Sequence, residues 1–256
     1  MILDRIVEAK KKEVEASKDI CPLSAMKEGL KSMAPTRNFR QALLEKGCAI
    51  IAEVKRKSPS RGIIRNDFDP LEIAEAYEKN GAAAVSVLTD EPYFGGKKEF
   101  LTRIKGGILL PVLRKDFIID PYQVYETKRL GADAVLFIAR LLKKGLAAYV
   151  RLAKALDLFP LVEVHSEEDL DLALAAGAEL IGINNRDLAT FETGLQTSLN
   201  LASLVPKSRI VIAESGIQSR KDVETLLQAG IHAFLIGETL MKADDLAEKL
   251  RELAGR

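Results

Sequence analysis

The sequence predicts an α/β protein, a (β/α)8 TIM barrel with an N-terminal helical extension. The first observation is a repeat, in which a helical stretch ends at Gly81, Gly131, Gly177 and Gly230. The second is that a short apolar segment follows each of these glycines and another lies midway in each gap. Because parallel strands need a long connection, usually a helix, this alternation favours repeated βα units over hairpins.

The first ~45 residues are expected to form the helical extension, with the barrel over 46–256 and both in one domain. Helical spacing opens the extension at Leu3, Ile6 and Val7. At least one further helix is predicted within 23–44, starting near Pro22 or Ser24. No Gly/Ser-rich linker separates the extension from the barrel, so we expect it to pack there.

Eight buried strands are then predicted. Their ranges are 49–55, 83–88, 111–115, 134–139, 159–163, 180–184, 210–214 and 233–236. A glycine that takes the left-handed conformation ends the helix before every second strand. Eight such units match a TIM barrel. A doubly wound sheet is the alternative, but the first strand is followed by KRKSPSRG instead of a glycine-rich nucleotide-binding turn.

Composition excludes several classes of protein. Lys plus Arg is 38 and Asp plus Glu is 37, so the net charge of +1 gives no global attraction to nucleic acid. Cys21 and Cys48 are too few for a disulfide framework. No segment approaches the ~20 apolar residues of a membrane span, and the N-terminus lacks a signal-peptide apolar region. We expect a cytoplasmic protein without nucleic-acid or membrane partners, as a monomer or weak homodimer.

Polar residues end several predicted strands, and active sites lie at this end of a TIM barrel. The candidate catalytic residues are Glu53, Lys55, Lys115, Glu163, Asn184 and Glu214. Lysines and glutamates that meet in a partly dry cavity acquire shifted pKa values and can exchange protons with a substrate. No metal is expected, because no trio of His, Cys or carboxylate residues has metal-ligand spacing. No cofactor is expected either. His165 and His232 are interpreted as surface or hydrogen-bonded core residues.

A phosphate site is predicted beside these residues. Ser215 and Gly216 follow the seventh strand, and Gly237 and Glu238 follow the eighth. Barrels of this kind often bind phosphate at these two loops through backbone N–H groups. Ser58, within a Ser-Pro-Ser segment at 58–60, adds a hydroxyl donor. The expected partner is therefore a small phosphorylated molecule.

An apolar group borders the same end of the barrel: Phe94, Phe117, Leu136 and Leu235. The two phenylalanines lie in loops after the second and third strands, where an aromatic side chain often lines a ring-binding pocket. The site is therefore expected to hold a phosphate at one end and an apolar ring at the other. The lysines lie between them, where a carboxylate or carbonyl group of the substrate is expected.

Six segments together resemble the indole-3-glycerol phosphate synthase family. They are AEVKRKSPS (52–60), VLTD (87–90), PVLRKDFI (111–118), INNRDL (183–188), AESGI (213–217) and LIGE (235–238). The resemblance runs in order along the whole barrel and includes the extension. AESGI alone is shared with related phosphate-binding barrels, whereas its combination with KSPS and LRKDF is specific.

The resemblance implies ring closure, decarboxylation and dehydration of 1-(2-carboxyphenylamino)-1-deoxyribulose 5-phosphate to indole-3-glycerol phosphate. It implies that Lys115 is the general acid, that Lys55 holds the carboxylate or assists proton transfer, and that Glu163 acts in the dehydration. Supporting roles are implied for Glu53, Asn184, Glu214 and Arg186. Phosphate contacts are implied for Ser58, Ser215, Gly216, Gly237 and Glu238, and a ring pocket for Phe94, Phe117, Leu136 and Leu235.

One departure from the family pattern concerns Glu238, since some relatives have Ser at this position. A Glu side chain there would repel phosphate, unless only its backbone N–H takes part. The alternatives are a phosphosugar isomerase and a phosphate-ligand sensor or scaffold. A phosphosugar isomerase, such as phosphoribosylanthranilate isomerase, usually needs a Cys and Asp pair at strand ends, but Cys48 lies at the start of the first strand. A phosphate-ligand sensor or scaffold would bind without forming product.

Overall fold

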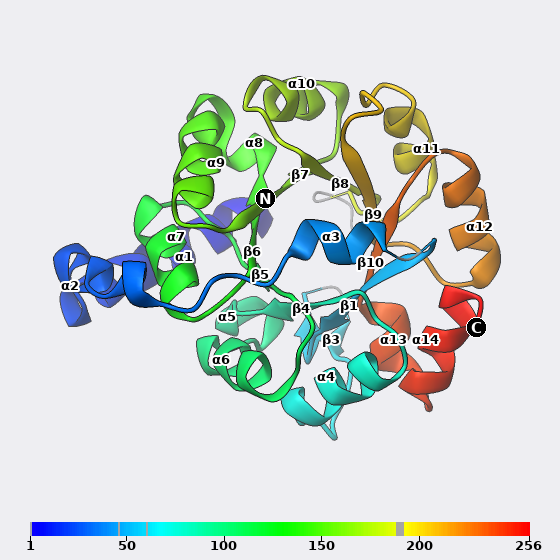
Figure 1. Ribbon diagram of the computed structural model, residues 1–256, viewed down its shortest axis with the longest axis horizontal. Coiled ribbons are helices and arrows are strands. Elements are labelled where there is room, and N and C mark those ends of the chain that lie inside the picture. Colours follow the sequence, from blue (N-terminus) through cyan, green and yellow to red (C-terminus); the bar gives the residue numbers. More distant parts are fainter. Residues whose placement is uncertain (1, 46, 60, 188–191) are drawn as a thin grey trace.

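The computed structural model describes residues 2–45, 47–59, 61–187 and 192–256. Its centre is a closed parallel barrel with the strand order β1-β10-β9-β8-β7-β6-β5-β4 (Figure 1). The strands are β1 (Ala49–Val54), β4 (Ala84–Leu88), β5 (Val112–Lys115), β6 (Ala134–Ile138), β7 (Phe159–Val164), β8 (Leu180–Asn184), β9 (Ile210–Glu214) and β10 (Ala233–Ile236). The predicted TIM barrel is confirmed, and each predicted strand end lies within one residue of the observed end.

Helices surround the barrel (Figure 1). They are α4 (Pro70–Lys79), α5 (Glu91–Phe94), α6 (Lys98–Gly107), α7 (Pro121–Arg129), α8 (Ala139–Leu142), the 3-10 helix η2 (Lys143–Gly145), α9 (Leu146–Ala155), α10 (Glu167–Ala175), α11 (Gln196–Ala202), α12 (Arg220–Gln228), α13 (Glu238–Lys242) and α14 (Leu246–Ala254). The four repeat glycines have φ between +73° and +89°, as the helix-ending interpretation requires. Among the described residues, no helix is both long and apolar enough to cross a membrane.

Alternation along the strands separates the barrel interior from the layer beneath the helices. In β1, Ala49 and Ile51 pack inside the barrel, whereas Ile50 and Ala52 belong to the cluster beneath the helices. Side chains of a strand alternate between its two faces, so Glu53 continues the inner series. The same period brings Lys115 of β5, Glu163 of β7 and Glu214 of β9 to the inner face. The charged residues therefore form the final inner layer, above an apolar one.

The extension consists of α1 (Ile2–Ile20), α2 (Leu23–Lys27), the 3-10 helix η1 (Leu30–Ser32) and α3 (Phe39–Leu44). The segment 23–44, in which at least one helix was predicted, thus contains three short helices. The first of them begins directly after Pro22, and no side-chain cap is formed there. Phe39 and Leu43 of α3 join the inner core and cover the N-terminal end of the barrel. By contrast, α1 packs against α7 on the outside.

A small antiparallel pair, β2 (Lys57–Ser58) and β3 (Gly62–Ile63), follows β1 and was not predicted. It contains the Ser-Pro-Ser segment, of which Ser60 lies outside the described residues. The last residue of the INNRDL segment, Leu188, lies outside them too. The pair places Ser58 at the C-terminal end of the barrel, where the side chain is buried.

Candidate active site

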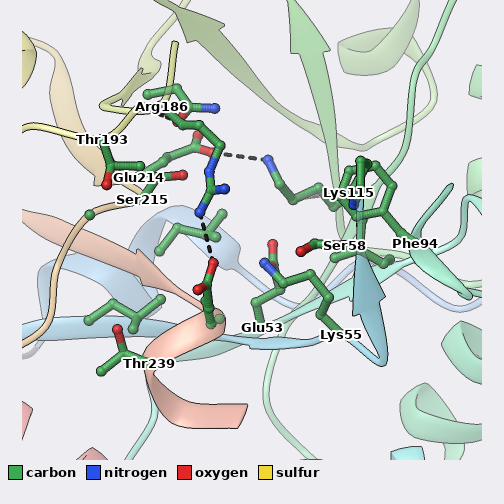
Figure 2. Close-up of a pocket in the computed structure, with 18 of the residues that line it drawn as sticks. Glu53, Lys55, Ser58, Phe94, Lys115, Arg186, Thr193, Glu214, Ser215 and Thr239 are labelled. Atoms are coloured by element: carbon green, nitrogen blue, oxygen red, sulfur yellow. Dashed lines mark hydrogen bonds and ion pairs between the residues drawn. The ribbon is translucent and has the colours of Figure 1, made fainter. Parts of the chain in front are cut away.

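The C-terminal ends of the strands surround a cavity of about 860 Å³ (Figure 2). Every candidate site residue from the sequence lines it. They are Glu53, Lys55, Ser58, Phe94, Lys115, Phe117, Leu136, Glu163, Asn184, Arg186, Glu214, Ser215, Gly216, Leu235, Gly237 and Glu238. The barrel topology explains this, because the ends of parallel strands meet at one rim.

Lys115, the last residue of β5, lies at the centre of the charged layer and extends toward Glu214 (Figure 2). Its Nζ is 3.0 Å from Glu163 Oε2 and 3.0 Å from Glu214 Oε2. Burial alone would lower the pKa of Lys115, but the two glutamates outweigh it and raise the pKa above its ordinary value. The carboxylates therefore keep Lys115 in its protonated ammonium form, which has a proton to donate.

The two glutamates on Lys115 differ in their protonation. Burial raises the pKa of Glu214, and the neighbouring Glu163 charge adds to this, while Lys115 offsets only part. Burial would also raise the pKa of Glu163, but Lys115 and His165 hold it below its ordinary value. One carboxylate is thus charged and the other favours its neutral form. Such a division is typical of paired acid and base groups.

Glu53 and Lys55 form a second pair across the cavity, with Lys55 Nζ 2.6 Å from Glu53 Oε1. Both are inner-face residues two apart on the chain, as the sequence predicted. Gly237 explains how Glu53 fits, because a Cβ there would lie 2.2 Å from Glu53 Oε1. A Cβ on Gly182 would likewise lie 2.1 Å from Glu214 Oε1. The two glycines therefore make room for the two glutamates.

The predicted phosphate side contains an unusual backbone. Ser215 and Gly216 have φ values of +65° and +77°, so two successive residues take the left-handed conformation. A non-glycine residue in this region is uncommon, and such strain gathers at functional sites. Asn185 stabilises the turn, because its Nδ2 donates to the Ser215 carbonyl at 3.1 Å. The loop lines the same cavity as Gly237.

Glu238 is surrounded by cations. Its carboxylate oxygens lie 2.9 Å from Arg186 Nη2, 2.5 Å from Lys242 Nζ and 3.4 Å from Arg61 Nε. Burial would raise the pKa of Glu238, but Lys242 and Arg186 hold it below its ordinary value. The negative charge that the sequence suggested would repel phosphate is therefore offset by three cations at this rim.

An aromatic pair forms the apolar side of the cavity. The rings of Phe94 and Phe117 have centroids 6.0 Å apart and are tilted by 36°. Phe94 belongs to α5, which Asp90 caps by accepting from the backbone N–H groups of Tyr93 and Phe94. Leu136 and Leu235 complete this side. The cavity thus has an apolar end and a polar end, with Lys115 between them.

Several lining residues were missed from the sequence. The start of α1 contributes Ile2, Leu3 and Ile6, and the rim contributes Arg61, Thr193 and Lys242. The helical spacing of the extension did mark Leu3 and Ile6 as an apolar face. No local signal could tell that this face covers the cavity, since docking of the extension depends on tertiary contacts.

His165 was interpreted as a surface or hydrogen-bonded core residue, but its ring is buried beside the charged layer. The side chain is 5% exposed, and Nε2 lies 3.3 Å from Glu163 Oε1. Neither ring nitrogen completes a well-formed hydrogen bond within the described part of the chain. The other histidine, His232, does accept from the Val211 N–H at 3.1 Å, at the opposite end of the barrel.

Cys48 directly precedes β1 and contacts the carbonyl of Leu253, so it lies at the opposite end of the barrel from the cavity. The described ranges contain no cluster of three or more His, Cys, Asp or Glu residues able to hold a metal ion. The charged groups that meet at the centre of the cavity are Lys115, Glu163 and Glu214.

Comparisons with known proteins match these features to one family. A family model described as indole-3-glycerol phosphate synthase matches residues 3–253. The chain is 48% identical over 255 residues to an indole-3-glycerol phosphate synthase of Alkaliphilus metalliredigens, covering 99% of this chain and 98% of that protein. It is 45% identical over 262 residues to one of Carboxydothermus hydrogenoformans, covering 99% of each.

More distant solved structures share the fold. A mandelate oxidase mutant with a C4a-OH-FMN adduct gives a TM-score of 0.58 at 20% identity, covering 82% of this chain and 72% of that chain. A structure described as native KDPGal gives a TM-score of 0.56 at 18% identity, covering 80% and 90%. At such identities the likeness concerns the barrel alone.

Proposed function

The chain belongs to the indole-3-glycerol phosphate synthase family, a carboxy-lyase family of tryptophan biosynthesis, and we propose how its cavity performs that reaction. The family's reaction converts 1-(2-carboxyphenylamino)-1-deoxyribulose 5-phosphate to indole-3-glycerol phosphate, carbon dioxide and water. One observation carries the proposal: the Lys115 ammonium lies between an apolar and a phosphate-suited end of one cavity, 3.0 Å from each of two glutamates.

The substrate matches the two ends of the cavity. Its benzoate ring is placed against Phe94 and Phe117, which supply an apolar aromatic wall. Its phosphate is placed at the Ser215, Gly216 and Gly237 loops, where backbone N–H groups are available. The carbonyl group then lies between these ends, near Lys115. This placement brings the ring carbon and the carbonyl carbon together, which lowers the entropic barrier to ring closure.

Lys115 acts as the acid of ring closure in this proposal. Attack of the ring carbon on the carbonyl carbon places negative charge on the carbonyl oxygen, and a positioned ammonium stabilises that charge and supplies a proton. Loss of carbon dioxide then restores the aromatic ring. Glu163 and Glu214 favour this role because they keep Lys115 protonated until the oxyanion develops.

Dehydration needs an acid at the departing hydroxyl and a base for the neighbouring C–H proton. Glu163 is charged and close to Lys115, so it suits one of these tasks. Lys55 would hold the substrate carboxylate or assist proton transfer, with Glu53 keeping it in place at 2.6 Å. Asn184 lies on the same rim and helps to orient Glu163 through a side-chain hydrogen bond.

The Glu238 carboxylate lines the same cavity as the proposed phosphate loops, where its negative charge would repel a phosphate group. Its side chain already binds Arg186 and Lys242, so we propose that it orders these cations while the loop backbone holds the phosphate. The cations then offset both Glu238 and the ligand. This assignment keeps Glu238 compatible with an anionic substrate.

The experiment is to supply the carboxyphenylamino deoxyribulose phosphate and follow indole fluorescence. The chain has no Trp, so background emission is low. We expect Lys115→Met to lower kcat by roughly 10²- to 10⁴-fold, the range of a general acid, while substrate binding stays measurable. Turnover at the wild-type rate in this variant would remove Lys115 from the acid role. Binding without any product in the unmodified protein would instead favour the sensor alternative.

Three expectations from the sequence remain proposals. They are the division of one domain into an extension and a barrel near residue 45, a cytoplasmic location, and a monomeric or weakly dimeric state. Limited proteolysis, cell fractionation and light scattering test them in turn.

A further inference from the structure

His165 connects the charged layer of the cavity to the outside of the barrel. It follows β7 directly, and its Nε2 lies 3.3 Å from Glu163 Oε1. The other oxygen of Glu163 is 3.0 Å from Lys115 Nζ. On the far side, His165 Nδ1 lies 3.7 Å from Asp169 Oδ2, an oxygen to which Arg140 donates twice, at 3.0 Å and 2.8 Å.

The series therefore runs from the cavity outward as Lys115, Glu163, His165, Asp169 and Arg140. Exposure changes along it, because Glu163 is 3% exposed and Arg140 is 35% exposed. An imidazole is the side chain best suited to pass a proton near neutral pH, since its two nitrogens can bind and release one. Here one nitrogen faces the cavity glutamate and the other faces the rim.

The overall reaction creates a need for such a path. At neutral pH the substrate carboxylate is ionised, whereas it leaves as neutral carbon dioxide. One proton goes to the carbonyl oxygen and a second to the departing hydroxyl, while only one returns from the C–H bond. Each turnover thus takes up one proton from solvent. Lys115 is 18% exposed and reaches solvent through the cavity, so a bound substrate covers it.

We propose that His165 relays protons from solvent to Glu163 and so restores the proton that Lys115 gives to the substrate in each turnover. A hydronium ion or a buffer acid gives a proton to Asp169 at the outer part of the series. Asp169 passes it to His165 Nδ1, and His165 Nε2 passes a proton to Glu163 Oε1. Rotation of the neutral Glu163 carboxyl group turns the protonated oxygen toward the neutral Lys115 amine, which takes that proton. The balance is one proton in from solvent and one onto the substrate, and no other bond changes. This relay rests on the proposed role of Lys115.

The surroundings of His165 support this role. The charged groups that face the series are Glu163 from β7, Asp169 from α10, Arg140 from α8, Lys115 from β5 and Glu214 from β9. Asp169 also accepts from the His165 backbone N–H at 3.0 Å, which fixes the start of the loop. The ring is thus held between two carboxylates, one on the cavity side and one on the outer side.

The test compares the only two histidines of the chain. His165→Asn keeps a polar side chain beside Glu163 but cannot carry a proton, and His232→Asn is the matched control at the opposite end of the barrel. We expect His165→Asn to lower kcat about 10-fold, less than loss of a directly acting acid, with KM nearly unchanged. The acid limb of its pH profile should move, and the solvent deuterium isotope effect on kcat should increase. His232→Asn should match the wild type in each respect.

A second variant separates relay from structure. In His165→Ala, added imidazole should restore kcat in proportion to the fraction of imidazolium present, because a free imidazole can fill the space and carry the proton. A loss that imidazole does not restore, with an unmoved pH profile, would assign His165 a structural role and overturn the relay. An unchanged kcat in His165→Asn would overturn it as well.

The two proposals fail in different ways. If Lys115→Met keeps its turnover, the acid assignment fails whatever His165 does. If Lys115→Met is inactive and His165→Asn behaves as the wild type, only the relay fails.

Discussion

Two buried charge clusters lie on opposite faces of β5. The inner one lines the cavity with each of its members, whereas the outer one reaches it only through Asp116. On the inner face, Lys115 meets Glu163 and Glu214. On the outer face, Asp116 meets Arg114 at 3.0 Å and Lys10 of the extension at 2.9 Å. Both clusters are nearly dry and both join a cation to carboxylates. Burial and charge together therefore do not distinguish a reactive site from a structural one.

The difference lies in how completely the carboxylates are satisfied. Asp116 accepts from Thr89, Arg114 and the Phe117 backbone N–H, in addition to its ion pair with Lys10. No side-chain atom of this outer cluster lacks a partner in the part of the chain that is described. In the inner layer, by contrast, Glu53 Oε2 and Glu214 Oε1 are buried without a hydrogen-bond partner.

An unsatisfied buried oxygen is costly, so native proteins keep few of them. The inner layer retains two at the end of a cavity, where a substrate hydroxyl or a transferred proton can satisfy them. The outer cluster has no such capacity, and its completed bonds instead hold loops in place. Lys10 also contacts Asp90, which caps the helix that carries Phe94. The outer cluster thus supports the wall of the cavity, to which it contributes only Asp116.

The largest expected effect outside the cavity is on Lys10. Its side chain is 1% exposed and forms ion pairs with Glu13, Asp90 and Asp116. Lys10→Met leaves Asp90 and Asp116 buried with less compensation, so we expect the free energy of unfolding to fall by about 3–5 kcal/mol. Urea denaturation measures this, and the folded protein should keep far more turnover than Lys115→Met.

Lys18→Met is the matched control for this prediction, because Lys18 lies on the same helix and pairs with Glu15 and Asp120 near the surface. It should cost about 1 kcal/mol or less. Equal losses in the two variants would show that the outer cluster contributes no more than a surface ion pair.

Most of the barrel could be predicted from the sequence because its signals are local. A helix-ending glycine such as Gly131 and an apolar strand after it each mark their own position. Lys115 was assigned to the cavity because it ends a predicted strand, and the C-terminal strand ends of a barrel meet at one face. Glu214 was assigned to it for the same reason.

The remaining features depend on contacts between distant segments. From the sequence, Lys10 could be assigned only to a helix. Its ion pair could not be predicted, because its partner Asp116 is far along the chain. His165 was interpreted as a surface or hydrogen-bonded core residue, because no local pattern indicates that its ring lies beside Glu163. The three cations around Glu238 converge from different loops for the same reason. Long-range electrostatic contacts of this kind leave no periodic signal in the sequence.

The protonation of Glu214 in the inner layer makes the free energy of unfolding depend on pH. Burial raises the pKa of Glu214, so the folded chain binds this proton more tightly than the unfolded chain does. Its contribution to stability is therefore full below the ordinary carboxyl pKa and is lost as pH rises through the raised folded value, by up to about 1.4 kcal/mol for each pH unit between the two. Glu214→Gln removes this dependence, so its advantage over the wild type should grow with pH.

Glu163 gives the opposite sign and serves as the control. Its pKa is lowered in the folded chain, so its contribution is present above the ordinary carboxyl pKa and is lost only as pH falls through the lowered value. Glu163→Gln should therefore lose stability relative to the wild type at neutral pH and recover in acid. Parallel curves of unfolding free energy against pH for the wild type and Glu214→Gln would contradict the raised pKa.

Two aromatic pairs differ in the same way as the two charge clusters, and the smallest effect is expected for them. Phe94 and Phe117 line the cavity, whereas Phe68 and Phe100, with centroids 5.7 Å apart, pack against the outer core. Phe94→Leu removes an aromatic face from the proposed ring pocket, worth about 1 kcal/mol, so KM should rise roughly fivefold with kcat little changed. Phe68→Leu removes a similar face elsewhere and should lower thermal stability while leaving KM as it is. A rise in KM of the same size in both variants would mean that aromatic packing acts on the cavity through general stability, and that Phe94 contributes no direct contact with the ring.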